Sequence, residues 1–138
     1  MREIDSGAPA GELPDGPPLE RWELAAVGPT WRPPVGETTV SLVDGALEVH
    51  SQALVFRARD VVDSTTGSPL VGVIPAASIV TIGPLSPGSA GSGAWMPGWQ
   101  QRFRSPGFVV GTDVGAWVFD GPKGPRRARE LRERFGIA

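Results

Sequence analysis

The sequence has no cysteine, and its single lysine, Lys123, stands beside twelve arginines. The lack of cysteine excludes disulfide bonds and thiolate chemistry. An arginine-rich and lysine-poor composition is typical of a protein encoded by a GC-rich bacterial genome. Charge is also missing from the middle of the chain, because no charged residue lies between Asp63 and Arg102.

The uncharged stretch contains an apolar run at residues 70–82. A membrane-spanning helix needs about 20 apolar residues, and this run ends well short of that at Gly83-Pro84. Pro75 in its middle would also remove a helical hydrogen bond. We therefore expect two short buried strands separated by Pro75.

The first fifteen residues are acidic and rich in glycine, alanine and proline, unlike the basic and then apolar order of a signal peptide. We therefore expect a cytoplasmic location, with association at the membrane periphery as the alternative. The formal net charge is -2 and the sequence pI is about 5.4, so we do not expect nucleic acid as a partner. The acidic N-terminal part and the basic C-terminal part could attract each other, or address different partners.

Proline and glycine divide the chain into three parts. Residues 1–18 hold little that could be buried and predict a disordered tail. Residues 19–37 predict a short helix followed by a proline-rich linker, since prolines suit the helix start and apolar residues recur on one face. Residues 38–138 predict the folded domain.

Alternating apolar residues predict a series of short strands within this domain. Asp44-Gly45 separates two alternating runs, and Asp-Gly in that setting is the strongest short hairpin signal, because both turn positions need positive φ. Asp113 to Gly115 predicts a second hairpin. The remaining strands are predicted, in chain order, at residues 53–58, 71–74, 78–82, 108–112 and 116–119.

Residues 125–135 predict a C-terminal helix, with Pro125 at its tolerated first position and Gly136 available to end it. The fold class is therefore mainly β: a small bent antiparallel barrel or roll of six to seven strands, closed by a C-terminal helix. The helix carries five arginines outside its apolar stripe: Arg126, Arg127, Arg129, Arg132 and Arg134. These arginines could contact a partner or anionic lipid, or form a solvated face that pairs with the acidic N-terminal segment.

The segment Gly72-Val-Ile-Pro-Ala-Ala-Ser-Ile-Val-Thr-Ile82 resembles a strand pair that recurs in bacterial members of the pleckstrin-homology-like (PH-like) barrel superfamily. The hairpin-to-helix ending at residues 114–135 is similar too, and the resemblance covers about residues 38–136. It implies a binding or scaffolding module rather than an enzyme. It does not imply recognition of lipid headgroups, because the first hairpin carries Asp44 and Glu48 where headgroup-binding members carry lysine and arginine.

Few residues suggest chemistry. The one histidine, His50, would need a nearby nucleophile and an orienting acid to act as a catalytic base, and we expect it to be structural or solvated instead. Asp60 and Asp63 form a close acidic pair, whereas a metal site needs three or four ligands. The glycine-rich residues 83–93 lack the lysine and the following helix of a phosphate loop. We expect no catalytic residue, no metal and no cofactor.

Trp95, Met96 and Trp99 stand together in a long loop of glycine, proline and serine at residues 83–98. Such apolar side chains are costly to leave in water. They could fold back over the mouth of the barrel, or form a tip that contacts a partner or a membrane.

Three functions follow from these observations. We expect a non-enzymatic interaction or scaffolding module in a bacterial cell, which presents the tryptophan loop or a sheet edge to a protein partner. The alternative is a peripheral membrane domain that uses Trp95, Trp99 and the arginine-rich helix. An enzyme is the second alternative, and it would need a pocket that gathers His50, or Asp60 and Asp63, with other polar groups.

Overall fold

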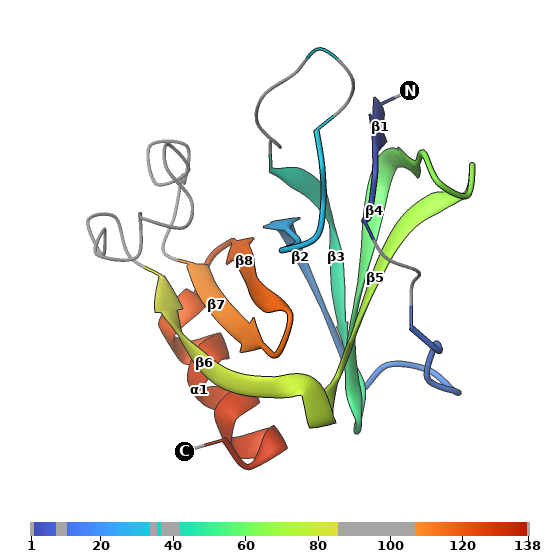
Figure 1. Cartoon of the computed structure of the whole chain (residues 1–138). Coiled ribbons are helices and arrows are strands. Elements are labelled where there is room, and N and C mark those ends of the chain that lie inside the picture. The colour runs from blue at the N-terminus through green and yellow to red at the C-terminus, as the bar shows by residue number, and fades with distance from the viewer. Residues whose placement is uncertain (1, 8–10, 34–35, 37–41, 86–106, 138) are drawn as a thin grey trace.

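The computed structural model describes residues 2–7, 11–33, 36, 42–85 and 107–137. These residues form one strongly curled sheet of eight strands with a helix at its C-terminal end (Figure 1). The elements are β1 (Arg2–Ile4), β2 (Glu20–Val27), β3 (Val43–Val49), β4 (Ala53–Asp63), β5 (Pro69–Pro75), the 3-10 turn η1 (Ala76–Ser78), β6 (Ile79–Leu85), β7 (Gly107–Thr112), β8 (Gly115–Asp120) and α1 (Gly124–Phe135).

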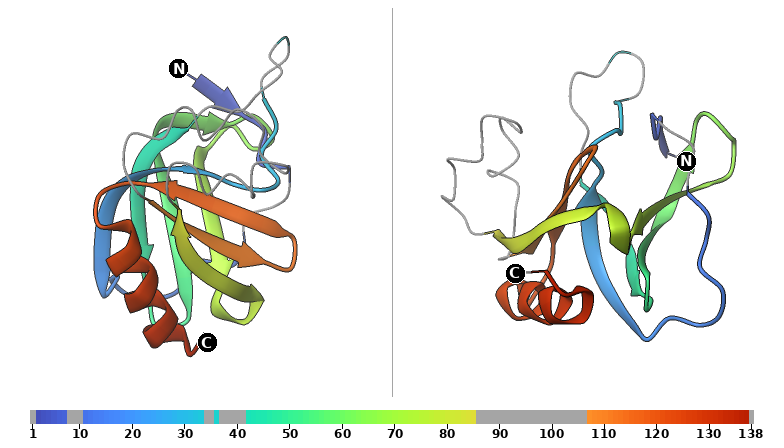
Figure 2. Two further views of the ribbon diagram at one scale, coloured as in Figure 1. Left: turned by 90° about the vertical axis from the view of Figure 1, so that its left-hand side faces the viewer. Right: turned by 60° about the horizontal axis from the view of Figure 1, so that its bottom comes forward.

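Seven of the eight strands form two antiparallel meanders. Strands β2 to β5 pair in chain order, and strands β6 to β8 do the same. Strand β8 also pairs with β2, which joins the two meanders, while β5 and β6 do not pair with each other. The sheet is therefore a half-barrel that is open between β5 and β6 (Figures 1 and 2). This confirms the predicted mainly β fold closed by a C-terminal helix.

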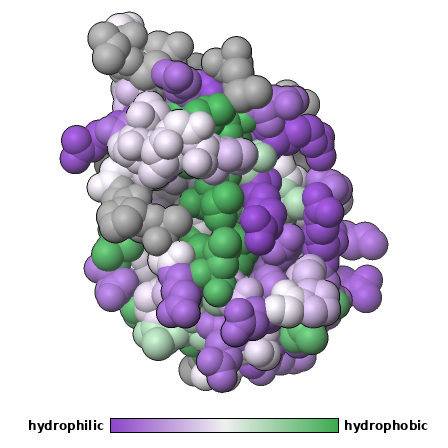
Figure 3. All heavy atoms as spheres, turned by 90° about the vertical axis from the view of Figure 1, so that its right-hand side faces the viewer, coloured by the Kyte–Doolittle hydropathy of each residue, from purple (hydrophilic) through white to green (hydrophobic). Residues whose placement is uncertain are grey.

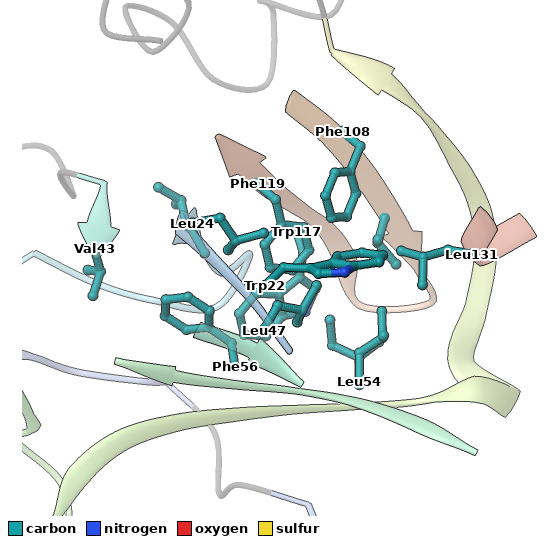
Figure 4. Packing of buried hydrophobic residues seen from close by; sticks show 14 of the residues in the cluster. Trp22, Leu24, Val43, Leu47, Leu54, Phe56, Phe108, Trp117, Phe119 and Leu131 are labelled. Atoms are coloured by element: carbon teal, nitrogen blue, oxygen red, sulfur yellow. The ribbon is translucent and has the colours of Figure 1, made fainter. Parts of the chain in front are cut away.

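The core fills the concave side of the half-barrel. Alternate residues of the strands point inward, and Figure 4 shows aromatic side chains from both meanders meeting there. Phe108 and Phe119 stack with ring centroids 5.0 Å apart, and Trp22 meets Phe108 edge-on at 6.1 Å. Helix α1 packs on β6 and β7 and buries Leu131 completely, so the predicted helix and its apolar stripe are confirmed.

The apolar run at residues 70–82 forms two strands, as the sequence predicted. Strand β5 ends at Pro75, and the short turn η1 separates it from β6. No helix among the described residues is long and apolar enough to cross a membrane.

Residues 20–27 form a strand, so the predicted helix at residues 19–27 is wrong. Trp22, Leu24 and Ala26 are buried, while the alternate residues Arg21 and Glu23 face solvent. This two-residue period suits the strand, which pairs with β3 on one side and β8 on the other. Pairing on both sides outweighs a helix signal that is too short to hold a helix in water alone.

The predicted hairpin turn at Asp44-Gly45 is also wrong, because β3 runs straight through both residues. Gly45 lies opposite Leu24 on one side and Ala58 on the other. A Cβ atom added to Gly45 would lie 2.2 Å from the carbonyl oxygen of Arg57. Close packing within the sheet, rather than a turn, requires the glycine here.

The predicted disordered tail is wrong for its first residues. Strand β1 pairs in parallel with the end of β4, which makes the sheet mixed rather than purely antiparallel. Ile4 is 1% exposed and belongs to the core. The described residues 11–18 carry no helix or strand.

We expect the substitution Gly45→Ala to lower the free energy of unfolding by about 1–3 kcal/mol, because the new methyl group would overlap a backbone oxygen that the ladder holds in place. Gly83→Ala is the matched control, since a Cβ atom on this strand glycine would have nothing within 4 Å. Urea titration of both variants measures the effect. Equal stability of the two variants would show that β3 and β4 do not approach each other this closely.

Candidate functional site

A pocket of about 140 Å³ opens beside β5, where the half-barrel is not closed by strand pairing. Four separate segments contribute to it: the N-terminal segment, the connection from β2 to β3, the strand β5, and the hairpin of β7 and β8. The residues that line the pocket are Ser6, Gly11, Pro29, Thr30, Trp31, Val71, Gly72, Val73, Val114 and Trp117. None of these side chains carries a charge.

Two tryptophans form the apolar part of this pocket. Trp31 and Trp117 meet edge-on with ring centroids 5.3 Å apart, and each is 7% exposed. The ring of Trp117 lies directly against the backbone of Gly72, because a Cβ atom on Gly72 would fall 2.2 Å from its Cη2 atom. Trp117 thus comes from β8 and reaches across the opening to β5.

Two residues of β5 that line this pocket, Val71 and Val73, direct their backbone groups away from β4. The amide of His50 donates to the carbonyl of Ala53 at 2.9 Å, so Ala53 faces β3. Successive residues of a strand face opposite neighbours, so the residues two and four positions after Ala53 face β3 as well. They lie opposite Val73 and Val71, which therefore direct their N–H and C=O groups toward the free edge of β5.

The prolines of β5 agree with this alternation. Pro69 lies two residues before Val71, and Pro75 lies two residues after Val73, so both prolines also face away from β4. A proline is tolerated there because its position needs no N–H donor toward β4. Outside the β4–β5 ladder, neither valine has a backbone hydrogen bond to another described segment. Figure 3 views this side of the molecule, and apolar side chains gather in a strip along the middle of the face.

Asp63 binds the N-terminal segment at the rim of the pocket through a hydrogen bond with Ser6. Its Oδ1 atom accepts hydrogen bonds from the amide of Thr65 at 3.0 Å, from the hydroxyl of Thr65 at 2.7 Å and from the amide of Ser6 at 3.4 Å. Burial alone would raise the pKa of Asp63, but the hydrogen bonds from Thr65 and Ser6 outweigh it and hold the pKa below its usual value. Thr30 donates a further hydrogen bond to the carbonyl of Ser6.

The structure does not bring the acidic pair and the histidine together as a site. Asp60 is exposed, and no group of three or more potential metal ligands gathers among the described residues. His50 is buried with its Nε2 atom 3.2 Å from Glu48, which also accepts from Arg57 at 3.0 Å. Burial alone would raise the pKa of Glu48, yet these two partners lower it.

Most of the helix arginines make contacts within the chain. Arg126 pairs with Glu130 at 3.2 Å, and the guanidinium of Arg127 lies 4.7 Å from the ring centroid of Trp22. Arg132 donates to the carbonyl of Ile82 at 3.1 Å, and Arg134 lies 3.7 Å from the carboxylate of Glu20. Only Arg129 is exposed without an ion pair to another described residue.

The apolar residues of the loop that the sequence singled out, Trp95, Met96 and Trp99, lie outside the described residues.

No protein-family model and no curated protein sequence matches this chain. Among solved structures, this chain is similar to the crystal structure of the C-terminal domain of an unknown protein from Leishmania infantum. The two chains are 13% identical with a TM-score of 0.53, and the match covers 86% of this chain and 83% of that chain. At this identity the similarity shows the fold alone, a curled β half-barrel with a C-terminal helix.

Sequence reasoning assigned no binding role to the residues of this pocket. It placed Trp117 in the strand predicted at residues 116–119 and Trp31 in the proline-rich linker. One signal could have indicated the edge. Pro69 and Pro75 lie an even number of residues apart, so they face the same side of the predicted strand, and proline within a sheet is confined to strands with a free edge.

We expect Asp63→Asn to lower the free energy of unfolding near pH 7 by about 1–2 kcal/mol, because the charged acceptor at the rim is lost. The pKa of Asp63 is lowered in the folded state, so its stabilising effect is present above the unfolded pKa of about 3.9 and disappears as the pH falls through the folded value. The difference from the wild type should therefore vanish in acid. Urea titrations across pH measure it, with the exposed Asp60→Asn as control. A difference that does not change with pH would contradict this role.

Proposed function

We propose that this chain is a non-enzymatic interaction domain that binds a partner protein at the open mouth of its half-barrel. The observation that carries the proposal is the free edge of β5 beside a pocket that contains two tryptophans. Tryptophan is enriched among the residues that dominate binding energy in protein interfaces. An unpaired strand edge supplies backbone donors and acceptors for a partner.

The size and chemistry of the pocket support binding rather than catalysis. Its volume of about 140 Å³ is well below the roughly 300–1,000 Å³ that is usual for small-molecule and cofactor sites. Its lining offers no charged side chain, histidine or thiol that could serve as a general base or an activated nucleophile. The residues that sequence reasoning named for an enzyme, His50, Asp60 and Asp63, are not among the lining residues.

We also propose that the domain belongs to the PH-like barrel superfamily. The support is the order of its elements: a meander from β2 to β5, a meander from β6 to β8, and a helix that packs on the second meander. The segment at residues 72–82 that resembles the superfamily pattern spans the change from the first meander to the second. Membership would agree with a binding or scaffolding role.

Peripheral association with a membrane is the competing function. It would depend on Trp95 and Trp99 and on free basic side chains of α1. Four of the five helix arginines already have partners within the chain, which leaves few to contact headgroups. The described residues therefore favour a protein partner over a lipid surface.

A photo-crosslinking amino acid at the position of Val114 tests the proposal. Val114 lines the pocket and is 66% exposed, whereas Val80 on β6 is 62% exposed and lies outside the pocket, so it is the matched control. We expect irradiation of the native host cells to give a protein adduct from position 114 and none from position 80. Adducts at both positions, or at neither, would contradict a partner at the mouth.

Sedimentation with lipid vesicles separates the two functions. We expect the full chain to remain in the supernatant with both neutral and anionic vesicles at physiological salt, since most helix arginines are held in contacts within the chain. The double variant Arg126→Ala/Arg129→Ala serves as the comparison. Sedimentation of the wild type with anionic vesicles only, lost in this variant and at high salt, would favour the membrane function.

A further inference from the structure

We propose that the partner at the mouth is an extended, basic peptide segment that pairs with β5 as an added strand and inserts one apolar side chain into the pocket. This inference rests on the function proposed above and names the chemistry of the ligand.

The first support is the backbone of β5. Val71 and Val73 together offer two N–H donors and two C=O acceptors at the free edge, and both residues line the pocket. An added strand about 4.8 Å from β5 would satisfy these four groups with its own backbone. Addition of a strand to an exposed sheet edge is a recurrent mode of peptide recognition, in which the backbone supplies affinity and pockets select side chains.

The second support is the position of the pocket relative to this edge. Gly72 stands between the two valines, and the direction of its missing Cβ atom leads to Trp117. The peptide residue opposite Gly72 would place its side chain on the same face of the sheet, toward the two tryptophans. The volume of about 140 Å³ resembles that of an engineered apolar cavity of about 150 Å³ that binds benzene. The pocket therefore fits one aliphatic side chain or one aromatic ring.

The third support is the charge around the rim. Asp5, Glu12 and Asp113 each directly adjoin a lining residue in the sequence, whereas Arg32 is the one base that does so. Adjacent Cα atoms lie 3.8 Å apart, so the backbone of these charged residues borders the pocket. Glu12 and Asp113 are exposed and form no ion pair with another described residue. A rim with this excess of acid favours a segment that carries lysine or arginine beside its apolar anchor.

A phage-displayed library of random dodecapeptides, selected on the full chain, identifies the preferred segment. We expect enriched sequences with one apolar residue flanked by strand-forming and basic residues. Enrichment of acidic or proline-rich sequences, or no enrichment over an unrelated protein, would overturn this inference. The crosslink at position 114 would still test the proposed function separately.

The enriched peptide, labelled with a fluorophore, then tests the pairing by fluorescence anisotropy. Val73→Pro removes one outward N–H group and leaves the β4 ladder intact, and the preceding residue is glycine, which tolerates a following proline. We expect about tenfold weaker binding with little change in Tm, while Val73→Thr, which keeps the donor, binds like the wild type. Equal affinity of both variants would contradict strand pairing.

Methylation of the peptide gives the same test without any change in the protein. N-methyl groups on the peptide residues that face β5 should abolish binding, whereas N-methyl groups on the alternate residues should preserve it. Equal binding of the two methylated peptides would overturn the inference. Glu12→Gln/Asp113→Asn should weaken binding several-fold at low salt and reduce its dependence on salt. An unchanged salt dependence would exclude the rim as the reason for a basic ligand.

Discussion

The contact between the ring of Trp117 and the backbone of Gly72 holds together two ends of a sheet that strand pairing does not join. Trp117 belongs to the second meander and Gly72 to the first, and β5 and β6 are not paired with each other. The same ring meets Trp31 at 5.3 Å and stacks on Phe119 at 6.1 Å, which fixes it from two more sides. Because side chains rather than a paired strand bridge this opening, no described segment pairs with the outward backbone groups of Val71 and Val73 on β5. The contact between Trp117 and Gly72 thus accounts for the pocket, for the free edge of β5 and for the packing between the two meanders.

Local sequence patterns were sufficient for the second meander and the helix. The hairpin of β7 and β8 has a short turn between two alternating runs, and α1 has a proline at its start, an apolar stripe and a glycine after its end. Pro75 separated β5 from β6 for the same reason, since a proline without a donor interrupts regular pairing. In these elements the residues that decide the structure lie close together in the chain.

The predictions that were wrong concern the first meander and strand β1, whose structure depends on contacts between residues that are distant in the sequence. Residues 20–27 contain apolar positions that fit both a helical and a strand period, and only their pairing with β3 and β8 decides between them. Asp44-Gly45 has the composition of a tight turn, but the close approach of Arg57 across the ladder requires the glycine. Strand β1 is three residues long, and no local pattern indicates that Ile4 is buried beside β4. The pocket shares this dependence, because its lining comes from four segments that long-range pairing brings together.

The two free ends of the half-barrel differ in a way that bears on their use. Unpaired strand edges invite association, and proteins usually protect them with prolines, charges or a covering element. On β6 the carbonyl of Ile82 accepts a hydrogen bond from Arg132, Pro84 lacks a donor, and α1 packs against the strand. On β5 the prolines stand only at the two ends, and the valines between them keep both donors and acceptors. Among the described residues, the edge of β6 is protected, whereas the outward backbone groups of the β5 valines beside the two tryptophans are unpaired. Selective binding at β5 requires this asymmetry.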